Sequence, residues 1–242
     1  MAEWFASVKA EFELNFIKAD RWEYLVTGLG NTLLLTLVAL IVGVLIGIVV
    51  AAVRSTYDKT AETARPSFGR RVFGFFNGLC KVYLTVVRGT PVVVQVMIFF
   101  YVIFATAKDG TMVAALAFGI NSGAYVAEII RGGIMSIDNG QFEAGRSLGF
   151  NYLQTMRYII VPQTIKNVLP SLMNEFIALL KETSIAGYIG LQDLTKGGDI
   201  IRSRTYSAFM PLIAVALIYL AIVLIFTQLI KILERRLRQS EH

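Results

Sequence analysis

Histidine and cysteine are almost absent from this chain of 242 residues. The only histidine is His242, the last residue, and the only cysteine is Cys80. A histidine-based zinc site and a serine–histidine–aspartate triad are therefore not expected, because both need a histidine within the fold. A single cysteine cannot form an intrachain disulfide.

Charge is scarce as well. Charged residues make up 17% of the chain and hydrophobic residues 55%, whereas an average soluble domain carries about 25% charged residues. The net charge is +6, but the cations are spread between apolar stretches and form no basic block, so nucleic acid is not an expected partner. The composition predicts a single integral membrane domain surrounded by lipid.

Five stretches are predicted to cross the membrane as helices, so the expected fold class is all-α. Three of them carry no charged residue: 28–53, 89–107 and 205–230. The other two are apolar but carry a few polar residues: 111–134 and 168–188. Between the spans, residues 54–81 and 187–204 are predicted to be loops, and residues 231–242 a charged tail.

Residues 1–27 mix acidic, basic and aromatic side chains, and they lack the basic start and apolar core of a signal peptide. Their apolar residues recur at helical spacing: Phe5, Val8, Phe12 and Phe16. One interpretation is an amphipathic helix on the outer membrane surface, anchored by Trp4 and Trp22. The other is a frayed polar leader. Residues 28–242 form the predicted transmembrane domain.

The distribution of positive charge predicts the orientation. With five spans, fifteen of the 23 lysine and arginine residues fall on the side that holds residues 54–81 and 139–166, and seven fall on the other side. Cytoplasmic loops are enriched in lysine and arginine. The N-terminus is therefore expected outside, and the C-terminus and residues 139–166 in the cytoplasm.

Polar residues on the third and fourth spans each share one side of a helix at 100° per residue. On the third span they are Asn121, Tyr125, Glu128 and Arg131, and on the fourth Asn174, Glu175, Lys181 and Glu182. An ionisable group that faces lipid is costly, so both stripes are expected to face protein or water. They predict a hydrated path between the two helices.

A spaced motif lies between these two spans. It begins with Glu143, Ala144 and Gly145, continues with Gly149 after three residues, and ends nine residues later with Ile159-Ile160-Val161-Pro162. This resembles the loop E-A-A-x3-G-x9-I-x-L-P of type I ABC importer permeases, with Gly145 in place of the second alanine and Val161 in place of the leucine. We expect Glu143 at a helix start, a turn at Gly149, and a boundary at Pro162.

Further stretches are similar to the branch of this family that imports polar amino acids: Arg88–Pro91, Gly123–Tyr125 with Glu128, Arg131–Gly133, Asn174–Phe176 and Lys181–Ser184. In that family the loop forms two short helices that dock onto a cytoplasmic ATPase. The resemblance implies a permease in a bacterial plasma (inner) membrane. It also implies two ATPase subunits, a second permease that is identical or homologous, and an extracytoplasmic solute-binding protein.

The resemblance also directs the assignment of substrate contacts. An amino acid is a zwitterion, so Glu175 is the candidate for its ammonium group, with Asn121, Tyr125 and Asn174 as hydrogen-bonding partners. Structural contact between helices is the alternative role for each of these residues. Ion pairs or gating contacts are expected for Glu128, Arg131, Lys181 and Glu182.

The chain has no G-x-x-x-x-G-K-[ST] phosphate-binding loop. We therefore expect no enzyme activity and no cofactor in this chain, with ATP and Mg²⁺ bound by the partner ATPase. An ion-coupled carrier that acts without an ATPase is the alternative function, because it would lack that loop too. A membrane-embedded enzyme is disfavoured by the shortage of histidine and cysteine.

Overall fold

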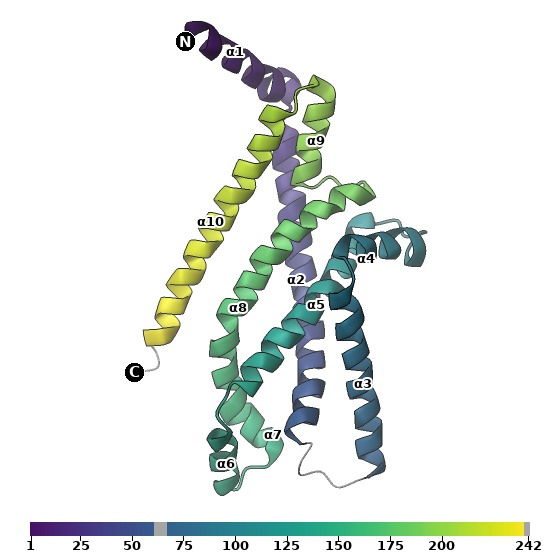
Figure 1. Cartoon of the computed structure of the whole chain (residues 1–242), viewed down its shortest axis with the longest axis vertical. Helices are drawn as coiled ribbons and strands as arrows, with labels where there is room; N and C mark the ends of the chain where they lie inside the picture. Colours follow the sequence, from purple (N-terminus) through teal and green to yellow (C-terminus); the bar gives the residue numbers. More distant parts are fainter. Residues whose placement is uncertain (61–66, 240–242) are drawn as a thin grey trace.

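The computed structural model describes residues 1–60 and 67–239, which form helices joined by short connections and no strands. The chain folds into an elongated helical bundle (Figure 1). Its longest helix, α2 (Trp22–Lys59), runs along the molecule. The short helices α6 (Asn139–Ser147) and α7 (Tyr152–Thr155) lie at one end, while α1 (Ala2–Phe12) and α9 (Leu194–Thr205) lie at the other.

The centre of the bundle is α5 (Gly110–Met135), which packs along α2. In the most apolar part of α5, 67% of the residues are buried, against 33% in α2. The two backbones come close at Gly47, where an added Cβ would lie 2.4 Å from Val126 Cγ1. A small residue at this position allows the helices to pack closely within the membrane.

Three described helices are long and apolar enough to cross a membrane: α2, α5 and α10 (Phe209–Gln239). Only 11% of the most apolar part of α10 is buried, so this helix lies at the edge of the bundle with its leucine and isoleucine side chains exposed. The charged tail predicted from residue 231 continues α10 as far as Gln239. Residues 240–242, with His242, lie outside the described part.

The prediction of a loop over residues 54–81 is wrong for most of its length. Helix α2 continues to Lys59, and α3 (Phe68–Gly89) accounts for the second half, while residues 61–66 lie outside the described part. Helix α3 is strongly amphipathic, with Asn77, Leu84 and Val87 buried. Its basic residues therefore reflect a polar helix face rather than an irregular linker.

The second predicted span, 89–107, is also wrong as a single helix. Helices α3 and α4 (Val92–Ile98), with the π-helical turn Phe99–Ile103, meet at an angle of 109°. The bend lies at Thr90 and Pro91, both in an extended conformation, because proline disfavours a helical residue before it. This bent pair is a possible fourth span.

The fourth predicted span begins earlier than expected. Helix α8 (Val161–Glu182) follows α7 without a break, through the π-helical turn Met156–Ile160. Proline has no N–H for the α-helical bond, and a π turn accommodates that loss. The boundary predicted at Pro162 is present only as the change from the π turn to α8, which begins at Val161, and the chain stays helical across it. A 3-10 helix, Thr183–Ile189, then leads to α9, so the loop predicted over residues 187–204 is mostly helical.

The N-terminal segment is helical and tied to the bundle, which contradicts a frayed leader. After α1 the chain forms a π turn, Glu13–Ile17, in which Asn15 is fully buried. The Asn15 amide donates to Ser207 Oγ at 3.3 Å and accepts from Thr205 Oγ1 at 2.8 Å. Trp4 and Trp22 are 64% and 46% exposed, so both are available as surface anchors.

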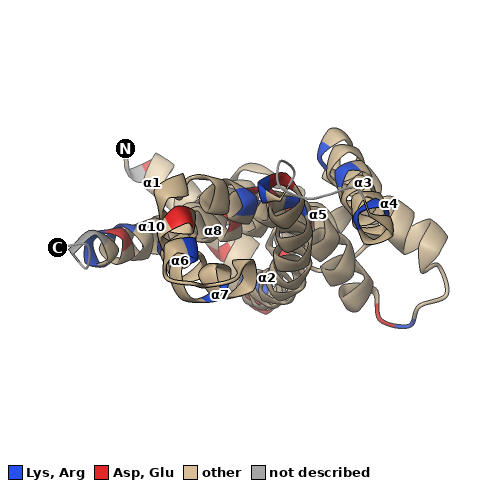
Figure 2. Cartoon of the chain, turned by 90° about the horizontal axis from the view of Figure 1, so that it is seen from below, with Lys and Arg blue, Asp and Glu red and all other residues tan. Residues whose placement is uncertain are grey.

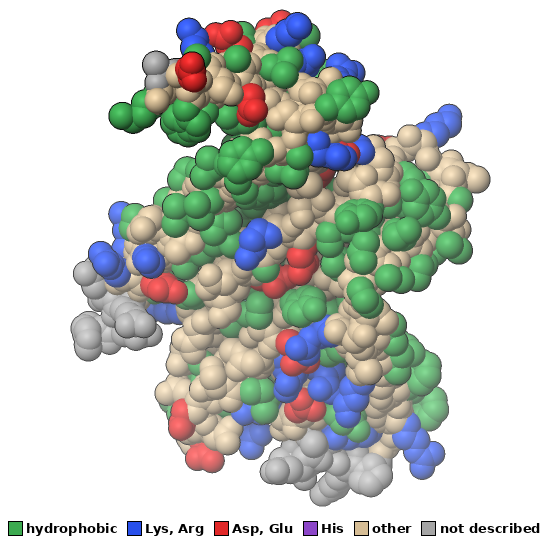
Figure 3. All heavy atoms as spheres, turned by 45° about the horizontal axis from the view of Figure 1, so that its top comes forward, with side chains coloured by type: hydrophobic (Ala, Val, Ile, Leu, Met, Phe, Trp, Pro, Cys, Tyr) green, Lys and Arg blue, Asp and Glu red, His purple; other side chains and the backbone are tan. Residues whose placement is uncertain are grey.

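Charged side chains gather at the two ends of the molecule, and hydrophobic side chains cover much of the face between them, with a few acidic and basic groups near its centre (Figure 3). Seen from the end that carries α6 and α7, basic side chains lie on α3, around these two short helices and near the end of α10 (Figure 2). An apolar band between charged ends is the surface expected of a protein that crosses a bilayer.

Candidate translocation path and coupling loop

The loop motif begins inside a helix rather than at its start. Helix α6 is capped by Asp138, whose carboxylate accepts from the backbone N–H of Gly140 at 2.6 Å. Glu143 is the fifth residue of α6, beyond the first turn, and it is exposed. The expectation that Glu143 begins the helix is therefore wrong: the cap position belongs to Asp138. Glu143 and the exposed Ala144 face solvent instead.

The turn predicted at Gly149 is confirmed. Gly149 has φ +81°, a left-handed conformation that glycine adopts at little cost. The N–H of Gly149 donates to Arg146 O at 2.9 Å, and the N–H of Phe150 donates to Gly145 O at 3.0 Å. This is the Schellman pattern that closes a helix. The next helix starts at once, because Asn151 and Gln154 form a capping box.

The two short helices are packed against the ends of the long ones. A buried cluster joins α5 and the segment that follows it to the loop: Ile134, Ile137, Phe142 and Ile160. Ile159 packs against this cluster from its edge. The loop is thus attached to the body of the protein by apolar contacts, which contribute more to stability than exposed charge pairs do.

Helix α2 holds the loop at two further points. Lys59 Nζ donates to Asn139 Oδ1 at 2.7 Å and lies 4.6 Å from the centre of the Phe142 ring. The Tyr152 hydroxyl donates to Thr56 Oγ1 at 3.3 Å, and burial raises the pKa of Tyr152. Helices α6 and α7 are therefore attached to the ends of both α2 and α5.

Gly145 departs from the alanine usual in the motif, and the structure gives the reason. The residue is buried, and an added Cβ would lie 2.7 Å from both Cγ2 and Oγ1 of Thr155. Thr155 is 2% exposed, and its hydroxyl donates to Asn151 O at 3.1 Å. The Thr155 side chain occupies the space that an alanine methyl group would need.

The polar stripes of α5 and α8 meet, but only in part. Glu175 accepts a hydrogen bond from Ser122 Oγ at 2.8 Å, which joins the two helices directly. Asn121 is 2% exposed and donates to Gln95 Oε1 on α4 at 3.0 Å. Sequence analysis missed Ser122 and Gln95, because hydroxyl and amide residues in apolar helices commonly serve packing alone.

The other two candidate substrate contacts are more open. Tyr125 is half-buried, and the Arg88 guanidinium lies 5.5 Å from the centre of its ring. Asn174 is exposed and donates to Pro170 O of its own helix at 3.1 Å. The four candidates therefore do not form one closed site within this chain.

Of the four residues predicted to form ion pairs or gating contacts, the two on α5, Glu128 and Arg131, form ion pairs. Arg131 pairs with Glu128 at 3.1 Å on the same helix and with Asp58 of α2 at 3.6 Å. Within residues 1–60 and 67–239, Lys181 and Glu182 form no ion pair. Asp58 was missed because it lies in the stretch predicted to be a loop.

A second polar feature appears only in the folded chain. A pocket of about 440 Å³ opens between α2, α3 and α5, and its charged lining residues are Arg54, Lys81, Arg88 and Glu128. Arg54 donates to Asn77 Oδ1 at 3.2 Å, while its buried Nε has no partner among the described residues. Because Arg131 already pairs with Glu128, the pocket presents mainly positive charge.

Comparison with known proteins identifies the family. Residues 43–239 match the family described as "Binding-protein-dependent transport system inner membrane component". The chain belongs to this family. A putative glutamine transport system permease protein of Rickettsia bellii is 38% identical over 181 residues, which cover 69% of this chain and 83% of that protein. The arginine transport system permease protein ArtQ of Bacillus subtilis is 38% identical over 185 residues, covering 70% and 84%.

Solved structures agree with the observed fold. A crystal structure of an amino acid ABC transporter with histidines contains a chain that is 41% identical, with a TM-score of 0.77 over 88% of this chain and 94% of that one. The MetNI methionine ABC transporter, in an inward-facing conformation, has a TM-score of 0.75 at 18% identity and shares the fold. The chain is thus an inner-membrane ABC importer permease, and the ion-coupled carrier is disfavoured.

Proposed function

We propose that this permease forms half of the path through which an ATP-driven importer carries a polar amino acid into the cell. The observation that carries the proposal is the helix–turn–helix loop that α2 and α5 hold at one end of the bundle. The names of the relatives, which include glutamine and arginine transport permeases, support an amino acid as the substrate.

The coupling loop, residues 139–166, receives force from a cytoplasmic ATPase. Its partner-facing side is the exposed side of α6, with Glu143 and Ala144, while Gly145, Gly149, Ile159 and Pro162 shape the loop behind it. Two ATPase subunits bind ATP and Mg²⁺ and close on them. Because the loop is packed onto the ends of α2 and α5, closure moves both helices and changes which side of the membrane the path faces.

The substrate lies along the polar sides of α5 and α8. Glu175 accepts the ammonium group, since Ser122 occupies only one of its hydrogen-bonding directions. Asn121, Tyr125 and Asn174 offer hydrogen bonds to the remaining polar atoms. The exposed position of Asn174 leaves room for a second permease, identical or homologous, to complete the site.

Glu128, Arg131 and Asp58 act as a gate contact between α5 and α2. The pair is half-buried, with side-chain exposures of 28% and 30% for Arg131 and Asp58. Because the Arg131–Asp58 pair keeps some contact with solvent, it contributes modestly to stability, on the order of 1 kcal/mol, and it can open and close at low cost. Lys181 and Glu182 contact the second permease instead.

The proposed topology has five spans, with the N-terminus outside and the C-terminus in the cytoplasm. The bent pair α3 and α4 is the second span, and α8 is the fourth. Helix α8 carries the charged residues Glu175 and Lys181 because, in this proposal, they face a polar path rather than lipid. Residues 1–27 lie on the outer membrane surface, and residues 28–242 form the transmembrane domain. A solute-binding protein delivers the amino acid at the end that carries α9.

The test is a pull-down from detergent-solubilised membranes of the native host, with the wild-type chain, Glu143→Lys and Glu23→Lys as baits. Glu23 is exposed at the opposite end of α2, so it controls for the charge reversal. Wild type and Glu23→Lys should recover an ATPase, and Glu143→Lys should lose it or lose substrate-stimulated ATP hydrolysis. Recovery of no ATPase, together with normal amino acid uptake by Glu143→Lys, would refute the proposal.

A further inference from the structure

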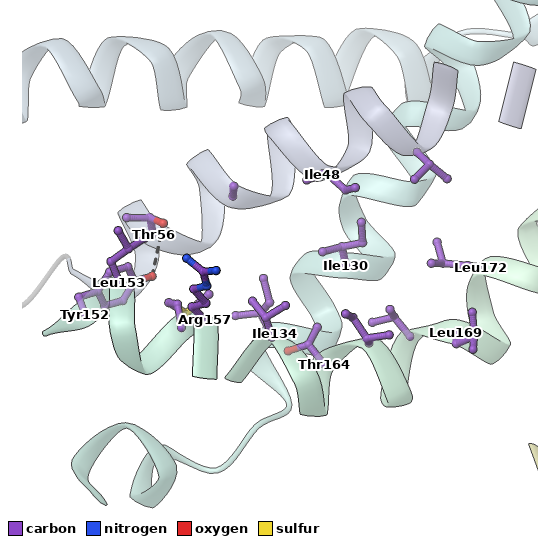
Figure 4. A pocket seen from close by; sticks show the side chains of 16 residues that line it. Ile48, Thr56, Ile130, Ile134, Tyr152, Leu153, Arg157, Thr164, Leu169 and Leu172 are labelled. Atoms are coloured by element: carbon purple, nitrogen blue, oxygen red, sulfur yellow. Dashed lines mark hydrogen bonds between the residues drawn. The ribbon is translucent and has the colours of Figure 1, made fainter. Parts of the chain in front are cut away.

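An apolar groove of about 520 Å³ runs between α2, α5 and the helix that leaves the coupling loop. Its walls include Ile48 and Ala52 of α2, Ile130 of α5, and Leu169 and Leu172 of α8 (Figure 4). The groove belongs neither to the polar stripes nor to the basic pocket. Its volume is in the range of sites that hold a small ligand.

One end of the groove is polar and positively charged. Arg157 is its only charged lining residue, and it lies near the hydrogen-bonded pair of Tyr152 and Thr56. Figure 4 shows the Arg157 side chain pointing from the π-helical turn toward α2, near Ile134. Arg157 forms no ion pair with an acid in the part of the chain that the structure describes. An unneutralised guanidinium beside an apolar channel fits a molecule with an anionic head and a hydrocarbon tail.

The groove lies on the lipid-facing side of α8, if the polar stripe faces the translocation path as proposed above. Ser171, Asn174 and Lys181 are exposed on the polar side. At 100° per residue, the groove residues Ile165 and Leu172 lie about half a turn away from Asn174 and Lys181. A second permease that meets the polar stripe therefore leaves the groove to the bilayer.

We propose that this groove binds an anionic phospholipid, with an acyl chain between α2, α5 and α8 and the phosphate on Arg157. The bound lipid would contact both the scaffold helices and the first turns after the coupling loop. It would therefore stabilise the attachment of the loop, and ATP-driven movement would depend on the lipid composition of the membrane.

Native mass spectrometry of the full chain in neutral detergent tests the binding. Phosphatidylglycerol is titrated against phosphatidylcholine with the same acyl chains. We expect phosphatidylglycerol to be retained preferentially, and Arg157→Gln to weaken its binding about tenfold through loss of a charge-assisted pair. Ala52→Trp, which fills the groove and keeps Arg157, should weaken it as well. Arg71→Gln removes the same charge from an exposed site on α3 outside the groove and should change nothing.

Equal phosphatidylglycerol binding in wild type, Arg157→Gln and Ala52→Trp would overturn the proposal, as would an equal loss in Arg71→Gln. A second copy covering the groove is tested with Leu169→Cys in a Cys80→Ser background. Disulfide-linked dimers in native membranes would assign the groove to a permease interface and overturn lipid binding, whereas an unlinked chain supports it. None of these measurements uses transport, so they can fail independently of the proposed function.

Discussion

Gly145→Ala restores the usual alanine of the loop motif, yet we expect it to destabilise this chain. The new methyl group would lie 2.7 Å from two atoms of Thr155, and ordinary contact begins near 3.4 Å, so the helices must separate by about 0.7 Å. Overpacking of a buried site costs roughly 1–3 kcal/mol. Alanine favours a helix over glycine by about 1 kcal/mol, which offsets part of that cost. The net expectation is about 0–2 kcal/mol of destabilisation.

Thr155→Ala provides the decisive background, because it removes the two atoms at 2.7 Å and leaves only the Cβ of residue 155, at 3.2 Å. In the Thr155→Ala background, alanine at position 145 keeps its preference for a helix and no longer meets the two Thr155 atoms at 2.7 Å. Gly145→Ala should therefore stabilise the folded chain by about 0.5–1 kcal/mol. Thermal unfolding of the four variants in detergent measures this change of sign, and substrate-stimulated ATP hydrolysis by the assembled transporter should follow the same order. An increase in unfolding temperature from Gly145→Ala of equal size in both backgrounds would refute the close contact between α6 and α7.

Three further predictions concern the path, the gate and the outer end of the chain. Glu175→Gln should raise the KM for amino acid uptake by proteoliposomes roughly ten- to a hundredfold, because an ionic hydrogen bond of about 1.5–3 kcal/mol is lost; unchanged uptake would remove Glu175 from the site. Arg131→Asp should lower the unfolding temperature and Asp58→Arg should restore it in the double variant, and absence of rescue would contradict their contact. Asp193 is buried and caps α9. Burial raises the pKa of its carboxyl group above the ordinary value. The stability that this carboxyl group contributes is therefore present below the ordinary pKa and is lost as the pH rises through the raised value. Asp193→Asn keeps a good cap and should therefore stabilise the chain at neutral pH by an amount that shrinks toward pH 4, as pH-dependent unfolding would measure.

The loop motif shows which features of the structure can be predicted from neighbouring residues alone. The turn at Gly149 was predictable, because a left-handed conformation and the caps on either side depend on neighbouring residues alone. The position of Glu143 was not, since the helix starts at Asp138, a cap that the motif does not include. Nor does the motif reveal why Gly145 replaces an alanine, which depends on contact with Thr155.

For the candidate translocation path too, the sequence predicts some features, and only the packed helices show the others. Periodicity placed Glu175 on a polar side of its helix, but Ser122 became its partner only because α5 and α8 pack together. In the basic pocket, Arg54 and Lys81 were predicted to lie in a loop, and Arg88 in a stretch just before the second span. Helix α3 forms this pocket with α2 through contacts such as that between Arg54 and Asn77.

The sequence by itself determined the membrane character of this protein and the site of its coupling loop, because hydrophobicity and short-range turn chemistry are local properties. Only the tertiary structure decided that α3 is a helix bent sharply against α4, that the loop is held by both α2 and α5, and that an apolar groove ends at Arg157. Each of these features depends on side chains far apart in the chain, and their contacts form only when the helices pack.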